Sequence, residues 1–510
     1  MRSVDSVVKK NMAERFISRE KAESDLLACA AFIAERIRSG DGHAEAMSEI
    51  VPRYLAKNDV DLAAELANAV NDPFSRDRLL IIVAEKCAEL DDDEYALQLV
   101  DSIEDHGLQA QAFERVALVK AGKGQYDTAA EVAESMAHSD SVYAGIAVHQ
   151  AANGDQTSAD ATLETIDFPS ARVSALQQIA ATYIGSDDGP HAVNALDRAV
   201  DAANEIEHDE EKIRSLCDIG NLYIDAKRSD KAIETFDRAR GLTEILDNTH
   251  RDSFLVNCAL GFLHSGSSDL ADRTLDMVID KTQMASALLG FARHYWKNDE
   301  KQDAIDALDE GHEILKSQRE AETRDSRARN GLLASFAVQF AAFSKSDRGI
   351  EIALENVDPN EKMAALSQIA QIQIRRKEDE LARQTINLIE DEANRLFALI
   401  ALSDARNKLG ETSESIALLD EAASLAETVP QQSARSGVLN GIAQRYAAHG
   451  KPETVRRIAI DNLAVISEIR DESSQAAAIA TVSDVYADAN LEPGDIERGR
   501  LQMLAKNAEI

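Results

Sequence analysis

Aromatic residues, proline and cysteine are scarce in this chain of 510 residues. Phe, Trp and Tyr make up 5% of it, and it contains 8 prolines and 4 cysteines. A chain poor in proline and aromatics suits helices that pack closely through small side chains. The cysteines are far apart in the sequence and form no CxxC pair, which argues against a disulfide framework or a zinc site. We expect small buried thiols in a reducing compartment at Cys29, Cys87, Cys217 and Cys258.

Basic residues are also in short supply. Lys and Arg number 55 against 91 Asp and Glu, which gives a formal net charge of -36. Such a surface repels phosphates, so we expect no nucleic-acid partner and no binding to anionic membranes. The apolar run from Leu26 to Ala34 is too short to cross a bilayer, so no membrane insertion is expected. The charge fits a solvated exterior, and we expect a cytoplasmic protein.

Apolar residues with helical spacing are what the sequence does contain. The segment 216–240 carries two stripes that predict two helices joined by the short polar turn AKRSD, which would form an antiparallel hairpin. A large residue at Gly220 should overpack the contact between the two helices. The stripes consist of Leu216, Ile219, Gly220 and Tyr223, followed by Ala232, Phe236 and Ala239.

The small position of this stripe recurs thirteen times along the chain. Successive intervals fall into a short class of 30–33 residues and a long class of 39–45. The long class adds roughly two helical turns, so the buried stripe keeps its face, and we expect longer helices there rather than long loops. The positions are Val51, Ala84, Ala117, Ala147, Ala180, Gly220, Ala259, Ala292, Ala337, Ala370, Ser403, Ala443 and Ser483.

This pattern resembles the tetratricopeptide repeat (TPR), in which helix A carries a large residue, leucine, glycine or alanine, and tyrosine, and helix B carries alanine, phenylalanine and alanine. The frequent closing proline of that family would fall at Glu244 and is absent. The resemblance implies an all-α, right-handed superhelical solenoid of about thirteen antiparallel helix pairs. It also implies that residues of helix A line a concave groove that binds protein partners.

The two ends of the chain depart from the repeat. We interpret 1–43 as a degenerate repeat forming N-terminal capping helices, 44–490 as the solenoid, and 491–510 as a C-terminal capping helix. Gly499 stands where helix B should be bulky, and repeat arrays need polar ends to stay soluble. Pro52 predicts that the first helix A is kinked or begins late.

No motif for catalysis or cofactor binding is present. The sequence lacks a P-loop, a GxGxxG after a strand, HExxH and GxSxG, so we expect no enzyme, no cofactor and no metal. The acidic run from Asp91 to Glu94 lacks the alternation and central glycine of a calcium loop and is interpreted as a turn with N-cap character.

The predicted groove is largely neutral or apolar, which suits an amphipathic helix or an extended apolar segment of a partner. Tight coiling that buries these residues against each other is the alternative. The family clamp for a C-terminal carboxylate is matched by Asn221 alone. The leading hypothesis is a protein-interaction scaffold for assembling a multiprotein complex. The alternatives are a regulatory subunit or helical-hairpin enzyme, and a self-associating homo-oligomer. The predicted partner-binding residues are Gln177, Asn221, Leu260, Leu263, Arg293, Trp296, Gln371, Asn440 and Gln444.

Overall fold

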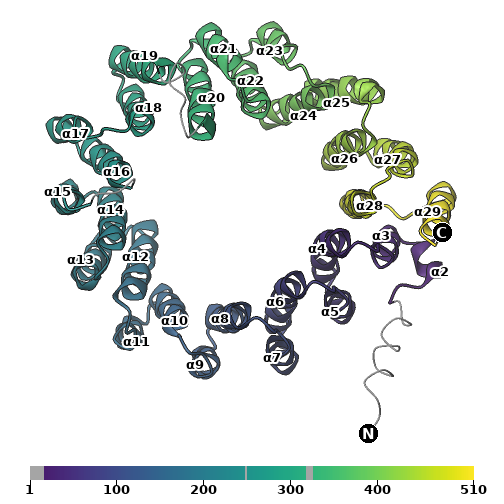
Figure 1. The fold of residues 1–510 in the computed structure, drawn as a ribbon, viewed down its shortest axis with the longest axis horizontal. Helices are drawn as coiled ribbons and strands as arrows, with labels where there is room; N and C mark the ends of the chain where they lie inside the picture. The colour runs from purple at the N-terminus through teal and green to yellow at the C-terminus, as the bar shows by residue number, and fades with distance from the viewer. Residues whose placement is uncertain (1–15, 247–249, 318–325, 510) are drawn as a thin grey trace. The chain divides into compact units, whose positions relative to one another are not determined.

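A computed structural model describes residues 16–246, 250–317 and 326–509. Within these ranges the chain forms α-helices and one short 3-10 helix, and no strand (Figure 1). The contacts divide the chain into two compact units. Unit 1 comprises 1–116 and 370–510, and unit 2 comprises 117–369. Each unit is described by itself.

The helices alternate between two kinds, in the order that the repeat predicts. Helices A are α4 (Gly40–Ala56), α6 (Pro73–Glu89), α8 (His106–Gly122), α10 (Asp140–Ala152), α12 (Pro169–Gly185), α14 (Asp209–Asp225), α16 (Arg251–His264), α18 (Lys281–Lys297), α20 (Ser326–Ala342), α22 (Pro359–Arg375), α24 (Glu392–Lys408), α26 (Gln432–Ala448) and α28 (Glu472–Asp488). Helices B are α5 (Val60–Asn68), α7 (Asp93–Asp101), α9 (Tyr126–Glu134), α11 (Gln156–Leu163), α13 (Gly189–Glu205), α15 (Ser229–Thr243), α17 (Ser268–Leu275), α19 (Lys301–Ser317), α21 (Ser346–Glu355), α23 (Asp379–Ile386), α25 (Thr412–Leu425) and α27 (Pro452–Ile466). Outside this alternation lie α2 (Arg19–Ala22), α3 (Leu26–Ala34), η2 (Ala426–Thr428) and α29 (Asp495–Asn507).

The predicted phase of the repeat is confirmed by burial and by the turns. All thirteen small positions are buried in helices A. Seven residues after each one, the chain adopts a left-handed conformation, as at Asp91 (φ 64) and Lys227 (φ 59). The next backbone N–H then donates to a carbonyl of helix A, for example from Arg228 to Tyr223 at 2.8 Å. This hydrogen bond ends helix A and turns the chain into helix B.

The long intervals are confirmed to hold longer helices. Helices B that lie within a short interval have 8–10 residues, as in α11 and α21. Those in the long class have 14–17 residues, as in α25 and α13. The 45-residue interval after Ala292 also contains 318–325, which lie outside the described residues. Added turns lengthen the pair without rotating its buried face, because the insertion is close to a whole number of turns.

A glycine contact explains the close packing at Gly220 in unit 2. A Cβ on Gly220 would lie 2.7 Å from Cζ of Phe236, and one on Gly261 would lie 2.3 Å from the same atom. The Phe236 ring is fully buried and packs edge-on against Phe262, with ring centroids 6.1 Å apart. Two glycines from neighbouring helices A therefore make room for one aromatic ring of helix B, as the sequence predicts for Gly220.

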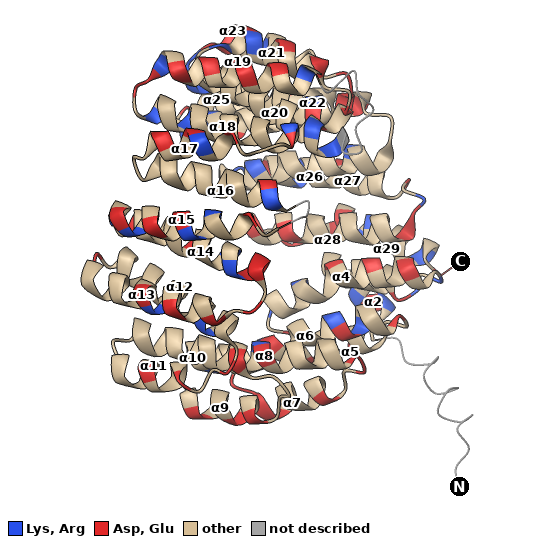
Figure 2. Cartoon of the chain, turned by 60° about the vertical axis from the view of Figure 1, so that its left-hand side comes forward, with Lys and Arg blue, Asp and Glu red and all other residues tan. Residues whose placement is uncertain are grey.

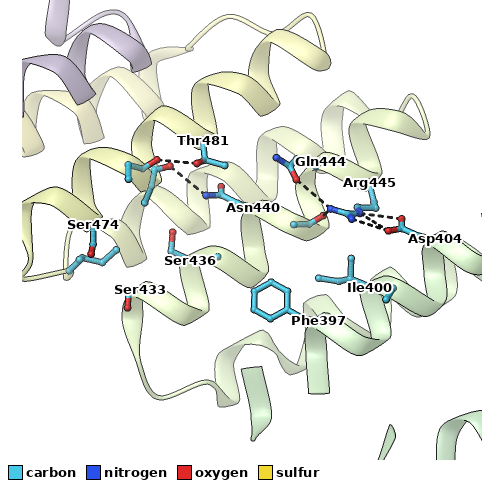
Figure 3. Close-up of a pocket in the computed structure, with 16 residues that line it drawn as sticks. Phe397, Ile400, Asp404, Ser433, Ser436, Asn440, Gln444, Arg445, Ser474 and Thr481 are labelled. Carbon is cyan, nitrogen blue, oxygen red and sulfur yellow. Dashed lines mark hydrogen bonds and ion pairs between the residues drawn. The ribbon is translucent and has the colours of Figure 1, made fainter. Parts of the chain in front are cut away.

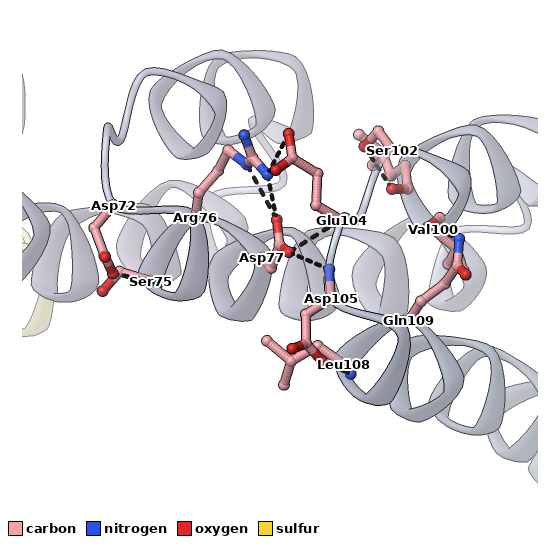
Figure 4. Close-up of polar contacts among 11 residues, drawn as sticks. Asp72, Ser75, Arg76, Asp77, Val100, Ser102, Glu104, Asp105, Leu108 and Gln109 are labelled. Atoms are coloured by element: carbon pink, nitrogen blue, oxygen red, sulfur yellow. Dashed lines mark hydrogen bonds and ion pairs between the residues drawn. The ribbon is translucent and has the colours of Figure 1, made fainter.

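A buried carboxylate joins two successive pairs in unit 1 (Figure 4). Asp77 on α6 is 1% exposed, and its Oδ2 accepts hydrogen bonds from the backbone N–H groups of Glu104 and Asp105, each at 3.0 Å. Its Oδ1 lies 2.8 Å from Nη2 of Arg76. Burial alone would raise the pKa of Asp77, but these hydrogen bonds and the Arg76 charge outweigh burial and lower it. The ionised carboxylate thus fixes the link between α7 and α8.

The two ends of the chain pack together within unit 1. Helix α3 lies against α28, α29 and α4 (Figure 1). Helix α29 lies against α27, α3 and α2. Arg53 of α4 pairs with Asp484 of α28 at 2.9 Å. The predicted boundaries at 43 and 490 stay predictions, and 1–15 lie outside the described residues. The late start predicted from Pro52 is wrong, because α4 begins at Gly40 and continues past it.

Charged residues of both signs are spread along the helices of both units, with acidic residues the more frequent (Figure 2). Ion pairs link neighbouring elements, such as Arg383 with Glu421 at 2.7 Å and Arg115 with Glu85 at 2.8 Å. No helix among the described residues is long and apolar enough to cross a membrane. All four cysteines are free and buried, and the Sγ atoms of Cys217 and Cys258 lie 3.8 Å apart.

Candidate functional site: a groove across three helices A

The candidate site is a groove of about 520 Å³ in unit 1 (Figure 3). Three helices A supply most of its walls, because their stripes place small and polar residues on one face. The lining residues are Phe397, Ile400, Ala401 and Asp404 of α24, Ser433, Ser436, Gly437, Asn440, Gly441, Gln444 and Arg445 of α26, Ile469, and Ser474, Ala477, Ala478 and Thr481 of α28.

Two glycines give the groove its depth. Gly437 and Gly441 are one helical turn apart on α26 and face α24. A Cβ on Gly437 would lie 3.6 Å from Cζ of Phe397, and one on Gly441 would lie 3.4 Å from Cδ1 of Ile400. These are ordinary contact distances, so the fold would accept alanine at either position. The glycines are therefore not required for packing, unlike Gly220, and their small size leaves space for something else.

An exposed aromatic ring forms the apolar part of the groove. Phe397 is 42% exposed, although it belongs to a helix whose other large apolar residues are mostly buried. Ile469 and the small residues Ala477 and Ala478 line the same groove. An apolar side chain of a partner could cover the Phe397 ring and remove it from water.

Amide and hydroxyl groups lie beside these apolar residues. Asn440 accepts a hydrogen bond from Nδ2 of Asn462 at 2.8 Å, and its own Nδ2 donates to the carbonyl of Ala478 at 3.5 Å. The Ser436 side chain is 1% exposed, and its Oγ has no hydrogen-bond partner. This hydroxyl is covered by protein atoms, so Ser436 forms part of the wall of the groove and does not reach a ligand.

An ion pair borders the groove at one end. Nη2 of Arg445 lies 2.9 Å from Oδ2 of Asp404, and Nε lies 3.1 Å from Oδ1. Arg445 also donates to Oε1 of Gln444 at 3.4 Å. The two charges neutralise each other, so the groove favours a neutral ligand over a strongly acidic or basic one.

Two of the predicted partner-binding residues, Asn440 and Gln444, meet in this groove. Asn440 is 6% exposed and is held by Asn462, so the expectation that it is exposed is wrong. The Asn440 side chain points toward Asn462 of α27 rather than toward solvent. Gln444 is half-buried, and its amide N–H groups can donate to a ligand. Gln371 is half-buried on α22, in the same unit but outside the groove lining.

Four predicted residues lie on consecutive helices A of unit 2. Gln177 donates to the carbonyl of Ser215 at 3.4 Å, and Asn221 is exposed. Leu260 is half-buried and packs against two apolar clusters. Leu263 is 1% exposed and belongs to the core, so the expectation that it is exposed is wrong. It has no surface to offer a partner, because neighbouring helices cover it.

The remaining two residues hold α18 to its neighbours in unit 2. Arg293 Nε donates to Oε1 of Gln339 at 2.8 Å. The Trp296 ring stacks on Phe343 with centroids 4.0 Å apart, and Lys301 Nζ lies 4.1 Å from the indole centroid. Both faces of the indole are therefore occupied, as the packing alternative predicts. A binding role for these residues stays a prediction.

The sequence interpretation missed Phe397, Gly437 and Gly441. The predicted partner-binding residues all lie three before, one after or four after a small position of helix A, and these three residues lie at other positions. The two glycines one turn apart in an otherwise regular helix were the available signal, because glycine weakens a helix without a packing reason.

The described residues contain no cluster of His, Cys, Asp or Glu that could hold a metal ion. Histidines with a lowered pKa lie outside the groove lining. His264 and His294 stack with centroids 5.3 Å apart, and burial lowers the pKa of both. His312 is fully buried between Glu355 and Arg348, and burial lowers its pKa despite the carboxylate. These arrangements are accounted for by packing between helices.

No protein-family model matches the chain, and no curated protein matches it. Solved structures of similar fold include Ton1535 from Thermococcus onnurineus NA1, at 17% identity over 79% of this chain and 98% of that one, with a TM-score of 0.24. They also include nearly identical TPR-like repeats from Podosopora anserina, at 17% identity over 44% and 100%, with a TM-score of 0.24. A Rap protein complexed with Competence and Sporulation Factor matches at 13% identity over 73% and 100%, with a TM-score of 0.28.

These TM-scores are low, so the fold assignment rests on this chain's own helices. Ten of the twelve pairs from α4 with α5 to α26 with α27 pack side by side, and the buried small residues and left-handed turns keep one phase throughout. The described residues therefore form an all-α array of TPR-like helical repeats.

Proposed function

We propose that this chain is a non-catalytic scaffold for protein–protein interaction, and that the groove across α24, α26 and α28 holds a segment of a partner polypeptide. The observation that carries the proposal is the groove itself. Its volume of about 520 Å³ combines the exposed Phe397 ring with the unfilled space beside Gly437 and Gly441. Apolar grooves between helices that carry a few polar groups are typical sites for peptides and helices.

The chemistry of the lining indicates what such a segment would carry. Phe397 and Ile469 would contact one apolar side chain of the partner. The amide of Gln444 would bond to polar groups of its backbone. The Arg445–Asp404 pair makes a net charge in this part of the segment unnecessary. We expect a neutral segment with one or two apolar residues.

The test is affinity capture of partners from the native cell, followed by mass spectrometry, with matched glycine variants. Gly441→Leu would fill the groove, because its side chain projects into the space above Ile400. Gly241→Leu is the control, since a Cβ at Gly241 meets nothing within 4 Å. Partners of the groove should be lost at least about tenfold by Gly441→Leu and retained by Gly241→Leu.

A second variant separates groove binding from general damage. Phe397→Ala removes the exposed ring and should weaken capture of the same partners, because aromatic side chains dominate binding energy at such sites. Equal recovery with the parent chain, Gly441→Leu and Phe397→Ala would contradict the proposal. Helical content measured by circular dichroism should be the same in all variants.

A further inference from the structure

The last helix A has no helix B from the sequence that follows it. Helix α28 is followed by α29, which is joined to α28 by the hydrogen bond from Tyr486 to Glu497 but packs against α27, α3 and α2. The helix that packs along α28 is α3, from the opposite end of the chain (Figure 1). The terminal helix pair of unit 1 is thus assembled from the first and last parts of the sequence.

The surface that α3 covers is strongly apolar. All nine residues of α3 are at most 3% exposed, and none carries a charge. The buried side of α28 includes Ile479, Val482 and Tyr486. Neither face could remain exposed without a large cost in solvation free energy, because burial of one such side chain contributes about 1.5–3 kcal/mol. The surface on α28 therefore needs a helix like α3 upon it.

A partly exposed ion pair also crosses this junction. Arg19 pairs with Glu509 at 2.8 Å, and their side chains are 48% and 36% exposed. Such pairs contribute little, so the apolar faces hold the junction together. The link between α3 and α4 is the short segment 35–39. The segment from 16 to 34 is therefore a separate docking element joined through one short link.

We propose that the face of α28 covered by α3 is an interaction surface whose partner is α3 of a second copy of this chain. Exchange of 16–34 between two copies replaces every contact by an identical one and leaves no apolar face exposed. The equilibrium then depends on protein concentration, because the short link favours docking within one chain at low concentration. The inference does not rest on the proposed groove function.

The test uses full-length chains with single cysteines at the exposed Arg19–Glu509 contact. One sample carries Arg19→Cys and the other carries Glu509→Cys, and the two are mixed, incubated at rising concentration and treated with a short bismaleimide. The four native cysteines are buried and do not compete in the folded chain. Links between Cys at 19 and Cys at 509 of different copies, in excess of those formed by random collision, require exchange.

The expected result is a covalent species with the mass of two chains, increasing with concentration, and its linkage identified by mass spectrometry. Arg19→Cys mixed with Glu313→Cys measures random collision, since Glu313 is exposed in unit 2 and lies outside the junction. Cross-links confined to single chains in an Arg19→Cys, Glu509→Cys double variant, with none between copies above that control at any concentration, would overturn the proposal.

A shortened link provides an independent measurement. Deleting Ile37 and Arg38 should prevent α3 from reaching α28 of its own chain and shift the protein to the mass of two chains in sedimentation. The nearly native cysteine variants keep the proposal testable if this deletion fails to fold. A folded deletion variant that stays monomeric at all concentrations would also contradict exchange.

Discussion

Some repeats with a short helix B differ from the repeats with a long helix B at one position, seven residues before the small residue of helix A. In three short repeats this position is Asp77, Asp140 or Asp252. Each carboxylate accepts a hydrogen bond from the backbone of the segment that leads into the next helix A, as from Ile279 and Asp280 to Asp252 at 2.8 and 2.6 Å. Because the short helix B ends early, backbone N–H groups of the link to the next helix A need a hydrogen-bond acceptor.

In the long repeats the same position is usually apolar and buried, as at Val173, Ile213 and Leu396. The last turns of the long helix B reach this place, and Ala202 and Ala203 of α13 belong to the same apolar cluster as Val173 and Ile213. The joint after these three short repeats is therefore held by a hydrogen-bonded carboxylate, whereas the joint after these long repeats is held by hydrophobic packing. We therefore expect that exchanging the aspartate and the apolar residue between the two kinds of repeat destabilises the joint.

Placing the aspartate of a short repeat at the equivalent position of a long repeat should have the largest effect. Ile213→Asp buries a carboxylate inside an apolar cluster, and uncompensated buried charges cost about 3–5 kcal/mol. We expect rapid hydrogen exchange in α13 and α14, measured by mass spectrometry. The control Ile213→Val, which keeps an apolar side chain one methylene smaller, should keep nearly all protection. Protection of these helices in Ile213→Asp equal to that of the parent would refute the distinction.

Removing the carboxylate from a short repeat should have the next largest effect. Asp77→Ala leaves the N–H groups of Glu104 and Asp105 without their acceptor, at about 1–3 kcal/mol for each buried group. The measurement is hydrogen exchange of a peptide covering 102–108, which should lose protection. Asp101→Ala, on an exposed residue nearby, is the control and should change nothing. Equal exchange in both variants would show that Asp77 is dispensable.

Adding one methyl group in a long repeat should destabilise it by about 1–3 kcal/mol through overpacking, even though alanine is the better helix former. Gly220→Ala places its Cβ 2.7 Å from the Phe236 ring, which Gly261 confines from the other side. Thermal unfolding followed by circular dichroism should show a lower midpoint. Gly241→Ala, where space is open, should raise it slightly, and the opposite order would contradict the packing argument.

Acid should loosen the link between α7 and α8 through Asp77. The pKa of Asp77 is lowered in the folded chain, so the folded state binds its proton less readily than the unfolded state. Its contribution is complete above the unfolded pKa of about 4 and is lost as the pH falls through the lower folded value. Exchange at 102–108 should therefore accelerate below about pH 4 relative to Asp77→Asn. Identical pH profiles would exclude this role.

The smallest effect on stability is expected at a glycine of a long repeat that has room for a methyl group. Gly437→Ala brings its Cβ to 3.6 Å from Phe397 and should stabilise α26 by up to about 1 kcal/mol. The same variant narrows the candidate groove, so partner capture should weaken while the unfolding midpoint rises. A lower midpoint would mean that Gly437 serves packing in the way that Gly220 does.

Much of the fold could be predicted from particular residues. The spacing of Leu216, Gly220 and Tyr223 predicts a helix face, and its recurrence predicts thirteen helices A whose small residues are buried, as found. The candidate site was harder to predict from the sequence than the fold. Asn440 and Gln444 lie in one groove, whereas Leu263 is buried in the core. A position on a helix predicts its direction, but the neighbouring helices decide its exposure.

The sequence by itself determined the repeat, its phase and the two lengths of helix B, because these depend on contacts between residues close together in the chain. The tertiary structure alone decided that α3 pairs with α28, that Cys217 lies beside Cys258, and that Phe397 stays exposed above two glycines. These outcomes depend on surfaces from segments far apart in sequence, and the local helical pattern carries no information about which surfaces meet.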